Sequence, residues 1–177
     1  MTQETEEMEL VRDWSITEFF ALAKAIEAEA VERYDLLADQ MEVHNNREIA
    51  AIFRKMAAIE GQHQRKIVDR AASAGVDDKT SFSWIRPSGP EAIDFEDAHY
   101  LMTPNQALQL ARFNEQRAVA FFEAVARKAS DGQVRAFALE LAKEERQHVV
   151  WLDQWLQQFP ETENGWDEDP DPPIYSE

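Results

Sequence analysis

The 177-residue chain contains no cysteine. Its absence excludes disulfide bonds, cysteine-bound zinc or iron–sulfur centres, and thiol catalysis within this sequence. Any bound metal must therefore be held by carboxylate and imidazole groups. Long apolar runs are also missing, since none reaches the ~18 residues that a membrane-spanning helix needs. The N-terminal residues are acidic rather than led by Lys or Arg, so we expect neither a signal peptide nor a membrane span, and a cytoplasmic protein is the simplest reading.

Positive charge is scarce. The sequence has 18 Lys and Arg against 35 Asp and Glu, which gives a formal net charge of −17. Such a polyanionic chain repels phosphate backbones, so direct binding of nucleic acid is not expected. Much of the acidity lies at the ends. We expect an acidic N-terminal segment over residues 1–14, a helical domain over 15–160 and an acidic, proline-rich tail over 161–177 that is extended or disordered.

Apolar residues recur at three- and four-residue steps in four long segments, which is the pattern of amphipathic helices. Capping boxes at Ser15–Glu18 and Thr103–Gln106 mark two of the starts, and Pro104 suits a first helical position. The expected helices run from the Ser15 cap to about 44, from about 47 to 73, from the Thr103 cap to the Asp131–Gly132 break, and from about 133 to 159. The sequence therefore predicts an all-α fold.

The connections between these helices predict the topology. Tight breaks at 45–46 and 131–132 make two antiparallel hairpins, and the segment from about 76 to 102 holds too many helix breakers for a regular element. Two hairpins joined by one long crossover form a ferritin-like four-helix bundle. Aligning Glu27 with Glu115, and Glu60 with Glu145, superposes similar residues in the two halves, which indicates a duplicated hairpin with pseudo-two-fold symmetry.

The second and fourth helices each carry a Glu-x-Gln-His motif, at residues 60–63 and 145–148. A glutamate and a histidine three residues apart lie on one helix face, so both can reach the same metal ion. The preceding helices each place one glutamate, Glu27 or Glu115, in an apolar stripe. All four glutamates fall near mid-helix, so antiparallel packing brings them to one level of the bundle.

Four carboxylates in an apolar core are strongly unfavourable without a counter-charge. Two divalent ions balance them, and the oxygen and imidazole ligands favour iron, with manganese or zinc as alternatives. We expect Glu60 and Glu145 to bridge the ions, which leaves positions open for oxygen or peroxide. The terminal ligands are then Glu27 with His63 on one ion and Glu115 with His148 on the other. A single motif would more often be a satisfied core group, but two motifs and two matched glutamates favour metal binding.

Tyr34 lies seven residues after Glu27 and faces the same core. It is either a donor to a metal ligand or a redox-active phenol, or it packs in the core with its hydroxyl satisfied locally. The last reading is favoured, because the matching position in the second half is Phe122 and the hydroxyl is not needed twice.

Residues 27–34 (EAEAVERY) and 57–63 (AAIEGQH) resemble the first and second helices of rubrerythrin-like di-iron proteins of the ferritin-like superfamily, and the resemblance covers about 15–159. It implies iron, oxygen or peroxide as substrate, and a homodimer. Without the cysteines of a rubredoxin domain, electrons would come from a separate donor or from the iron being oxidised. Rubrerythrins also carry a further glutamate where this chain has Ala118, and the remaining six-ligand set is similar to bacterioferritin ferroxidase centres.

Three functions are compatible with this pattern. The first is a rubrerythrin-type oxidoreductase that reduces peroxide or oxygen, and the second is a ferroxidase or iron-handling protein. The third is a non-catalytic bundle that its metal stabilises and that acts in an assembly. The first two share one ligand set and differ in the fate of the iron once it has been oxidised.

Overall fold

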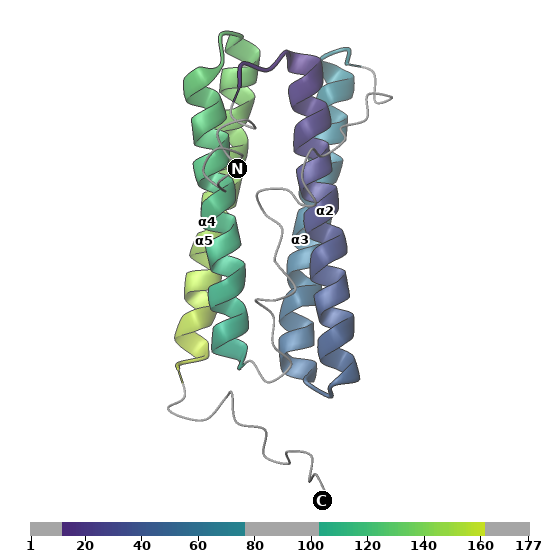
Figure 1. Cartoon of the computed structure of the whole chain (residues 1–177), viewed down its shortest axis with the longest axis vertical. Coiled ribbons are helices and arrows are strands. Elements are labelled where there is room, and N and C mark those ends of the chain that lie inside the picture. The colour runs from purple at the N-terminus through teal and green to yellow at the C-terminus, as the bar shows by residue number, and fades with distance from the viewer. Residues whose placement is uncertain (1–11, 77–102, 162–177) are drawn as a thin grey trace, which may run out of the picture.

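A computed structural model describes residues 12–76 and 103–161 of the chain, and these residues form four helices and no strand (Figure 1). The helices are α2 (Ile16–Val43), α3 (Arg47–Ser73), α4 (Pro104–Lys128) and α5 (Gly132–Gln158). The all-α prediction is confirmed. None of the four helices combines the length and apolar character needed to cross a membrane. Most of the expected N-terminal segment, the crossover and the C-terminal tail lie outside the described residues.

The helices begin where their capping residues are. The side chain of Ser15 accepts a hydrogen bond from the backbone of Glu18, whose carboxylate accepts one from the backbone of Ser15, so the predicted capping box is present. Thr103 and Gln106 make the same reciprocal pair at the start of α4. Asp131 caps α5 by accepting from the second residue of that helix. Each box satisfies backbone groups that the first helical turn leaves without a partner.

The helix ends also follow from local chemistry. Asn45, between α2 and α3, has a φ of 60°, and Gly75, after α3, has a φ of 72°. Asn and Gly are the residues that adopt this left-handed conformation most readily. Gly132, expected to be part of a break, is instead the first residue of α5. The break itself is confined to the residues between Lys128 and Gly132.

The four helices pair as two antiparallel hairpins, α2 with α3 and α4 with α5 (Figure 1). Contacts within each hairpin are extensive, whereas those between hairpins are fewer and join α3 to α4 and α2 to α5. This arrangement confirms the predicted ferritin-like bundle. The repeated hairpin places equivalent halves of the sequence opposite each other.

Two apolar clusters fill the interior, one towards each end of the bundle. In the first, Phe19 makes edge-to-face contacts with Phe122 and Phe137. In the second, Tyr34 stacks on Phe53 with ring centroids 6.0 Å apart. The clusters are separated because the apolar stripe of every helix is interrupted at the same level by buried polar residues. Apolar packing thus holds a polar layer in the middle of the bundle.

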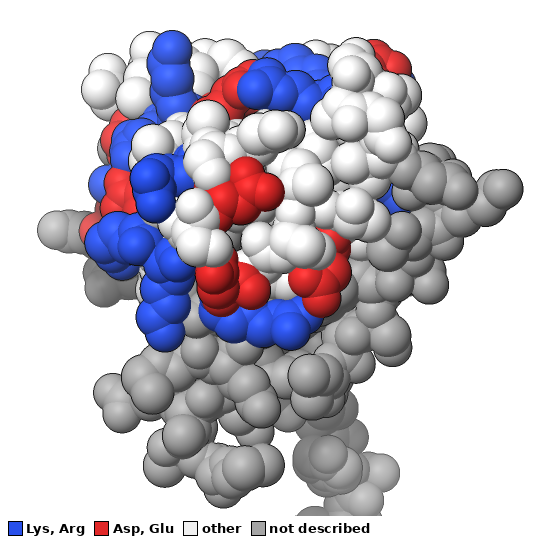
Figure 2. All heavy atoms as spheres, turned by 90° about the horizontal axis from the view of Figure 1, so that it is seen from above, with Lys and Arg blue, Asp and Glu red and all other residues white. Residues whose placement is uncertain are grey.

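Acidic and basic side chains both cover the bundle surface. Figure 2 views the end where α2 begins, and there Lys and Arg side chains lie beside Asp and Glu. Arg12 pairs with Glu18 at 3.0 Å, and Arg70 of α3 pairs with Glu140 of α5 at 2.6 Å. Exposed pairs of this kind contribute about 0–1 kcal/mol each. Their main consequence is that this end of the described bundle is not uniformly negative.

Candidate metal centre

The polar layer contains all six side chains that the sequence predicts as metal ligands. Each is at most 4% exposed. One comes from α2, two from α3, one from α4 and two from α5: Glu27, Glu60, His63, Glu115, Glu145 and His148. The fold therefore brings together residues from both halves of the chain, as the duplicated hairpin predicts. Their role as ligands stays a prediction.

Glu60 and Glu145 each extend between the two imidazoles. The two oxygens of Glu145 lie 3.2 Å from Nδ1 of His63 and 2.9 Å from Nδ1 of His148. Those of Glu60 lie 3.9 Å and 3.5 Å from the same two nitrogens. A carboxylate that offers one oxygen to each of two imidazoles is placed to bridge two ions bound beside them. This arrangement is the one expected for bridging glutamates.

The remaining two glutamates each lie beside one histidine. Glu27 has an oxygen 3.8 Å from Nδ1 of His63, and Glu115 has an oxygen 3.2 Å from Nδ1 of His148. These pairs match the terminal ligands expected from the sequence. The two imidazole rings stack with centroids 4.4 Å apart, so both Nδ1 atoms face the same group of carboxylates.

The chemistry of this donor set fits bound metal. One ligand atom from each of Glu60, His63, Glu145 and His148 lies within 4.8 Å of the others. Both oxygens of Glu60 and of Glu145 are buried, and within the described chain neither glutamate accepts a hydrogen bond of good geometry. Burial of such groups without compensation is costly. Divalent cations bound among them would remove this cost, and oxygen with imidazole ligands suits iron, manganese or zinc.

The pKa values of two buried glutamates show the same cost of burial in the metal-free protein. Burial, with the nearby charges of Glu115 and Glu145, raises the pKa of Glu60 well above its usual value. Burial also raises the pKa of Glu115 to about 7, although a hydrogen bond with His148 opposes the shift. Both shifts make these glutamates easier to protonate than an exposed carboxyl group when no cation is bound.

The two imidazoles stabilise the negative charge of Glu145. Burial alone would raise the pKa of Glu145, but the close imidazoles of His148 and His63 outweigh it and lower that pKa to about 2. Burial would likewise lower the pKa of His148, but the carboxylates of Glu115 and Glu145 beside its Nδ1 atom raise it to about 11. In the metal-free protein a proton on His148 supplies part of the positive charge that the carboxylates require.

Tyr34 contacts a predicted ligand on the opposite hairpin. The residue is 2% exposed, and its hydroxyl donates a hydrogen bond of 3.4 Å to Glu115. Tyr34 thus packs in the core, as the favoured reading expects, but its hydroxyl bonds to Glu115 of the opposite hairpin rather than to a local group, and its role as a donor to a metal ligand stays a prediction. Phe122 occupies the equivalent place without a hydroxyl, so the two halves of the centre differ here.

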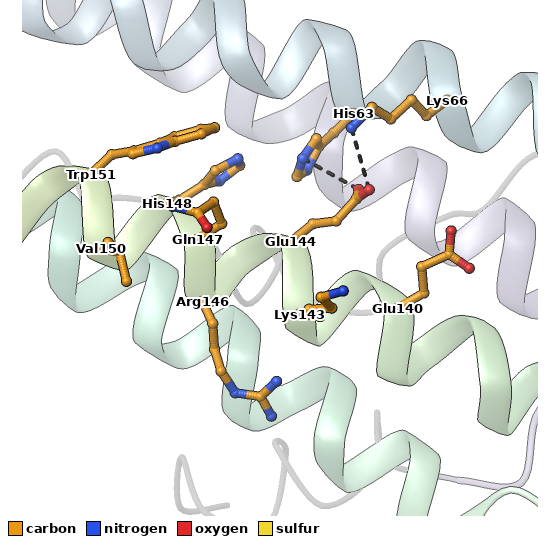
Figure 3. A pocket seen from close by; sticks show the side chains of 10 residues that line it. All are labelled: His63, Lys66, Glu140, Lys143, Glu144, Arg146, Gln147, His148, Val150 and Trp151. Atoms are coloured by element: carbon orange, nitrogen blue, oxygen red, sulfur yellow. Dashed lines mark hydrogen bonds and ion pairs between the residues drawn. The ribbon is translucent and has the colours of Figure 1, made fainter.

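Two side chains that contact the histidines were not predicted from the sequence. An oxygen of Glu144 lies 3.4 Å from Nε2 of His63, and Figure 3 shows this carboxylate directed at the ring. The indole of Trp151 stacks on His148 with centroids 5.3 Å apart. Asn114 was not predicted either: it is 2% exposed, and within the described chain its Nδ2 atom lacks a hydrogen-bond partner. The position of Glu144 directly before the second motif was the available signal.

A pocket of about 680 Å³ reaches the centre between α3 and α5 (Figure 3). Its walls carry three basic and two acidic side chains, and the two histidines line it as well. The lining residues are His63, Lys66, Glu140, Lys143, Glu144, Arg146, Gln147, His148, Val150 and Trp151. Of the six predicted ligands, the two imidazoles line this pocket.

Comparisons with known proteins agree with this geometry. A family model described as Rubrerythrin matches residues 18–83, which include the first Glu-x-Gln-His motif. A solved structure of an uncharacterised conserved protein from Magnetospirillum magnetotacticum MS-1 is 37% identical, with a TM-score of 0.63. The match covers 86% of this chain and 100% of the other. The search of curated proteins found no significant match.

Proposed function

The chain belongs to the rubrerythrin family, and from this premise we propose that it is a di-iron oxidoreductase that reduces hydrogen peroxide or dioxygen. The bridging geometry of Glu60 and Glu145 is the observation that carries the proposal, because it provides for two ions rather than one. Iron is the metal that the family and the Glu/His donor set favour.

Two bound ferrous ions would supply the two electrons that, with two protons, convert one hydrogen peroxide molecule into two water molecules. The residues of the chain perform the other tasks. Glu60 and Glu145 would hold the two ions between them, and His63 and His148 would each bind one ion. Tyr34 holds the orientation of Glu115 through its hydroxyl. Apolar clusters on both sides exclude bulk water from this layer.

The pocket favours a small uncharged oxidant over incoming metal as the substrate. Three basic residues line it, and one of them, Lys143, has no ion-pair partner among the described residues. Lys143 would repel a ferrous ion at short range, whereas it would not repel hydrogen peroxide. The balance of charges on the walls therefore supports peroxide or oxygen reduction as the first function.

Rapid mixing of the di-ferrous protein with peroxide, and separately with oxygen, tests the proposal. We expect stoichiometric oxidation of two irons per chain within one exponential phase for at least one oxidant. A His63→Gln variant should lose this reaction, and His44→Gln is the matched control, because His44 is exposed and lies outside the centre. Slow, non-stoichiometric oxidation with both oxidants would contradict the function.

Iron oxidation for storage or transfer is the second candidate. It is supported by Ala118, which is fully buried where rubrerythrins carry a further glutamate, so that the ligand set resembles a ferroxidase centre. This function predicts that the protein accumulates iron above two per chain and retains it through gel filtration. A fixed ratio of two after repeated addition of iron and oxygen would exclude storage.

A further inference from the structure

The two halves of the centre carry matching predicted ligands, but the groups on the outer side of the two histidines differ. Aligning Glu60 with Glu145 pairs Ile59 with Glu144, and the same alignment pairs Lys66 with Trp151. Glu60 and Glu145 each offer one oxygen to each imidazole, but the groups on the outer side of each imidazole are chemically different. Each ring is therefore held in place by a different kind of contact.

His63 is held by a carboxylate on its outer side. Its Nδ1 atom faces the buried glutamates, and its Nε2 atom lies 3.4 Å from an oxygen of Glu144. The second oxygen of Glu144 lies 3.3 Å from Nζ of Lys66. The Glu144 side chain is 27% exposed, so the pair stands at the edge of the pocket rather than in the core (Figure 3). A carboxylate in this place can accept a hydrogen bond from Nε2–H once a metal ion occupies Nδ1, which would fix the orientation of the ring.

His148 has no equivalent carboxylate support within the described chain. The symmetry-related position on α3 is Ile59, whose side chain cannot accept a hydrogen bond. Trp151 instead lies against the ring, with the two planes inclined by 26°. Stacking restricts the ring but gives its Nε2 atom no carboxylate acceptor, whereas a carboxylate on the outer nitrogen makes an imidazole a stronger ligand.

We infer that Glu144 is a positioning residue that orients His63 and makes the two metal positions unequal. The ion beside Glu27 and His63 binds more tightly, and the ion beside Glu115 and His148 binds more weakly. The inference rests on the dinuclear centre proposed above and adds an order of binding to it. Loss of such outer support lowers metal affinity by roughly 10–100-fold in other sites.

Titration of the metal-free protein with Co²⁺, followed by its visible absorption, tests this inference. The wild type should bind two ions in two resolved steps. In Glu144→Gln the tighter step should weaken by about tenfold while the weaker step changes by less than about twofold. Glu140→Gln is the matched control, because Glu140 lines the same pocket from α5 and pairs with Arg70 rather than with a histidine. Glu144→Asp should restore part of the difference.

The assignment of the steps is checked with one variant of each histidine. His63→Gln should remove the tighter step, and His148→Gln the weaker one. In the zinc-loaded protein, the Nε2–H signal of His63 should be protected from exchange with water, and Glu144→Gln should abolish that protection. Equal wild-type affinities, or two-step binding unchanged by Glu144→Gln, would overturn the inference and leave the proposed function standing. Fewer than two ions bound by the wild type would overturn both.

Discussion

The hydroxyl of Tyr34 on α2 donates a hydrogen bond to Glu115 on α4, 81 residues further along the chain. This contact joins the two hairpins through a predicted metal ligand. The second half of the chain cannot make the equivalent hydrogen bond, because the residue that aligns with Tyr34 is Phe122, which has no hydroxyl. The duplicated halves have thus diverged at the edge of the centre while keeping all six predicted ligands.

Replacing Tyr34 with phenylalanine tests this contact. The fold should be retained, since Phe122 already fills the equivalent space. The free energy of unfolding of the metal-free protein should fall by about 0.5–1.5 kcal/mol, because buried Glu115 loses a donor. Urea denaturation measures the change, and an unchanged free energy would show that the hydroxyl does not support Glu115. Phe53→Tyr, which adds a hydroxyl in the same cluster, is not expected to compensate.

Replacing the buried carboxylate of Glu60 should stabilise the metal-free protein while weakening its binding of metal. In Glu60→Gln, the metal-free protein should gain about 1–2 kcal/mol of unfolding free energy, because burial and the charges of Glu115 and Glu145 already raise the pKa of Glu60. The variant should lose the stabilisation that bound metal gives the wild type. Thermal unfolding with and without Mn²⁺ measures both effects, with exposed Glu32→Gln as the control. A metal-free variant less stable than the wild type would argue for a structural role of Glu60.

Metal binding should release protons and strengthen as pH rises. At pH 7 the metal-free protein holds a proton on His148, whose pKa is raised to about 11, and part of one on Glu115, whose pKa is about 7. Both groups must be deprotonated to bind an ion. Apparent Co²⁺ affinity should therefore increase from about pH 6 to pH 8. Calorimetry in buffers of different ionisation enthalpy counts the protons, and binding without proton release would contradict the assignment of these ligands.

Trp151 should report occupancy of the centre by fluorescence. Its indole stacks on His148, so a paramagnetic ion bound there should quench it. Trp151→Phe should remove most of the fluorescence change on addition of Fe²⁺, whereas Trp155→Phe, one turn further along α5, should preserve it. Equal responses in the two variants would place the bound ion elsewhere.

Most of the fold could be predicted from the sequence because its signals are local. The Ser15 and Thr103 capping boxes, the apolar periodicity and the short turns determine the helices and their pairing. The burial of the six glutamate and histidine residues of the centre could be predicted as well, since each interrupts an apolar stripe at a matching height. Apolar periodicity therefore predicts a residue's place well when its whole helix face lies in the core.

The outer contacts of the histidines could not be predicted in the same way. Glu144 is partly exposed, so periodicity gives it no reason to contact His63 on another helix. Trp151 is 38% exposed, and a tryptophan at such a position is equally compatible with a core edge or an interface. Whether such side chains meet depends on the relative rotation of α3 and α5, which the pattern of either helix alone does not determine.

The central claim is that the buried Glu/His cluster holds a pair of iron ions. Its most direct test is Mössbauer spectroscopy of the wild type reconstituted with ⁵⁷Fe, combined with iron analysis of the same sample. A dinuclear centre should give two irons per chain and, after oxidation, a diamagnetic ground state from two coupled ferric ions. One iron per chain, or magnetically isolated ferric ions, would contradict it.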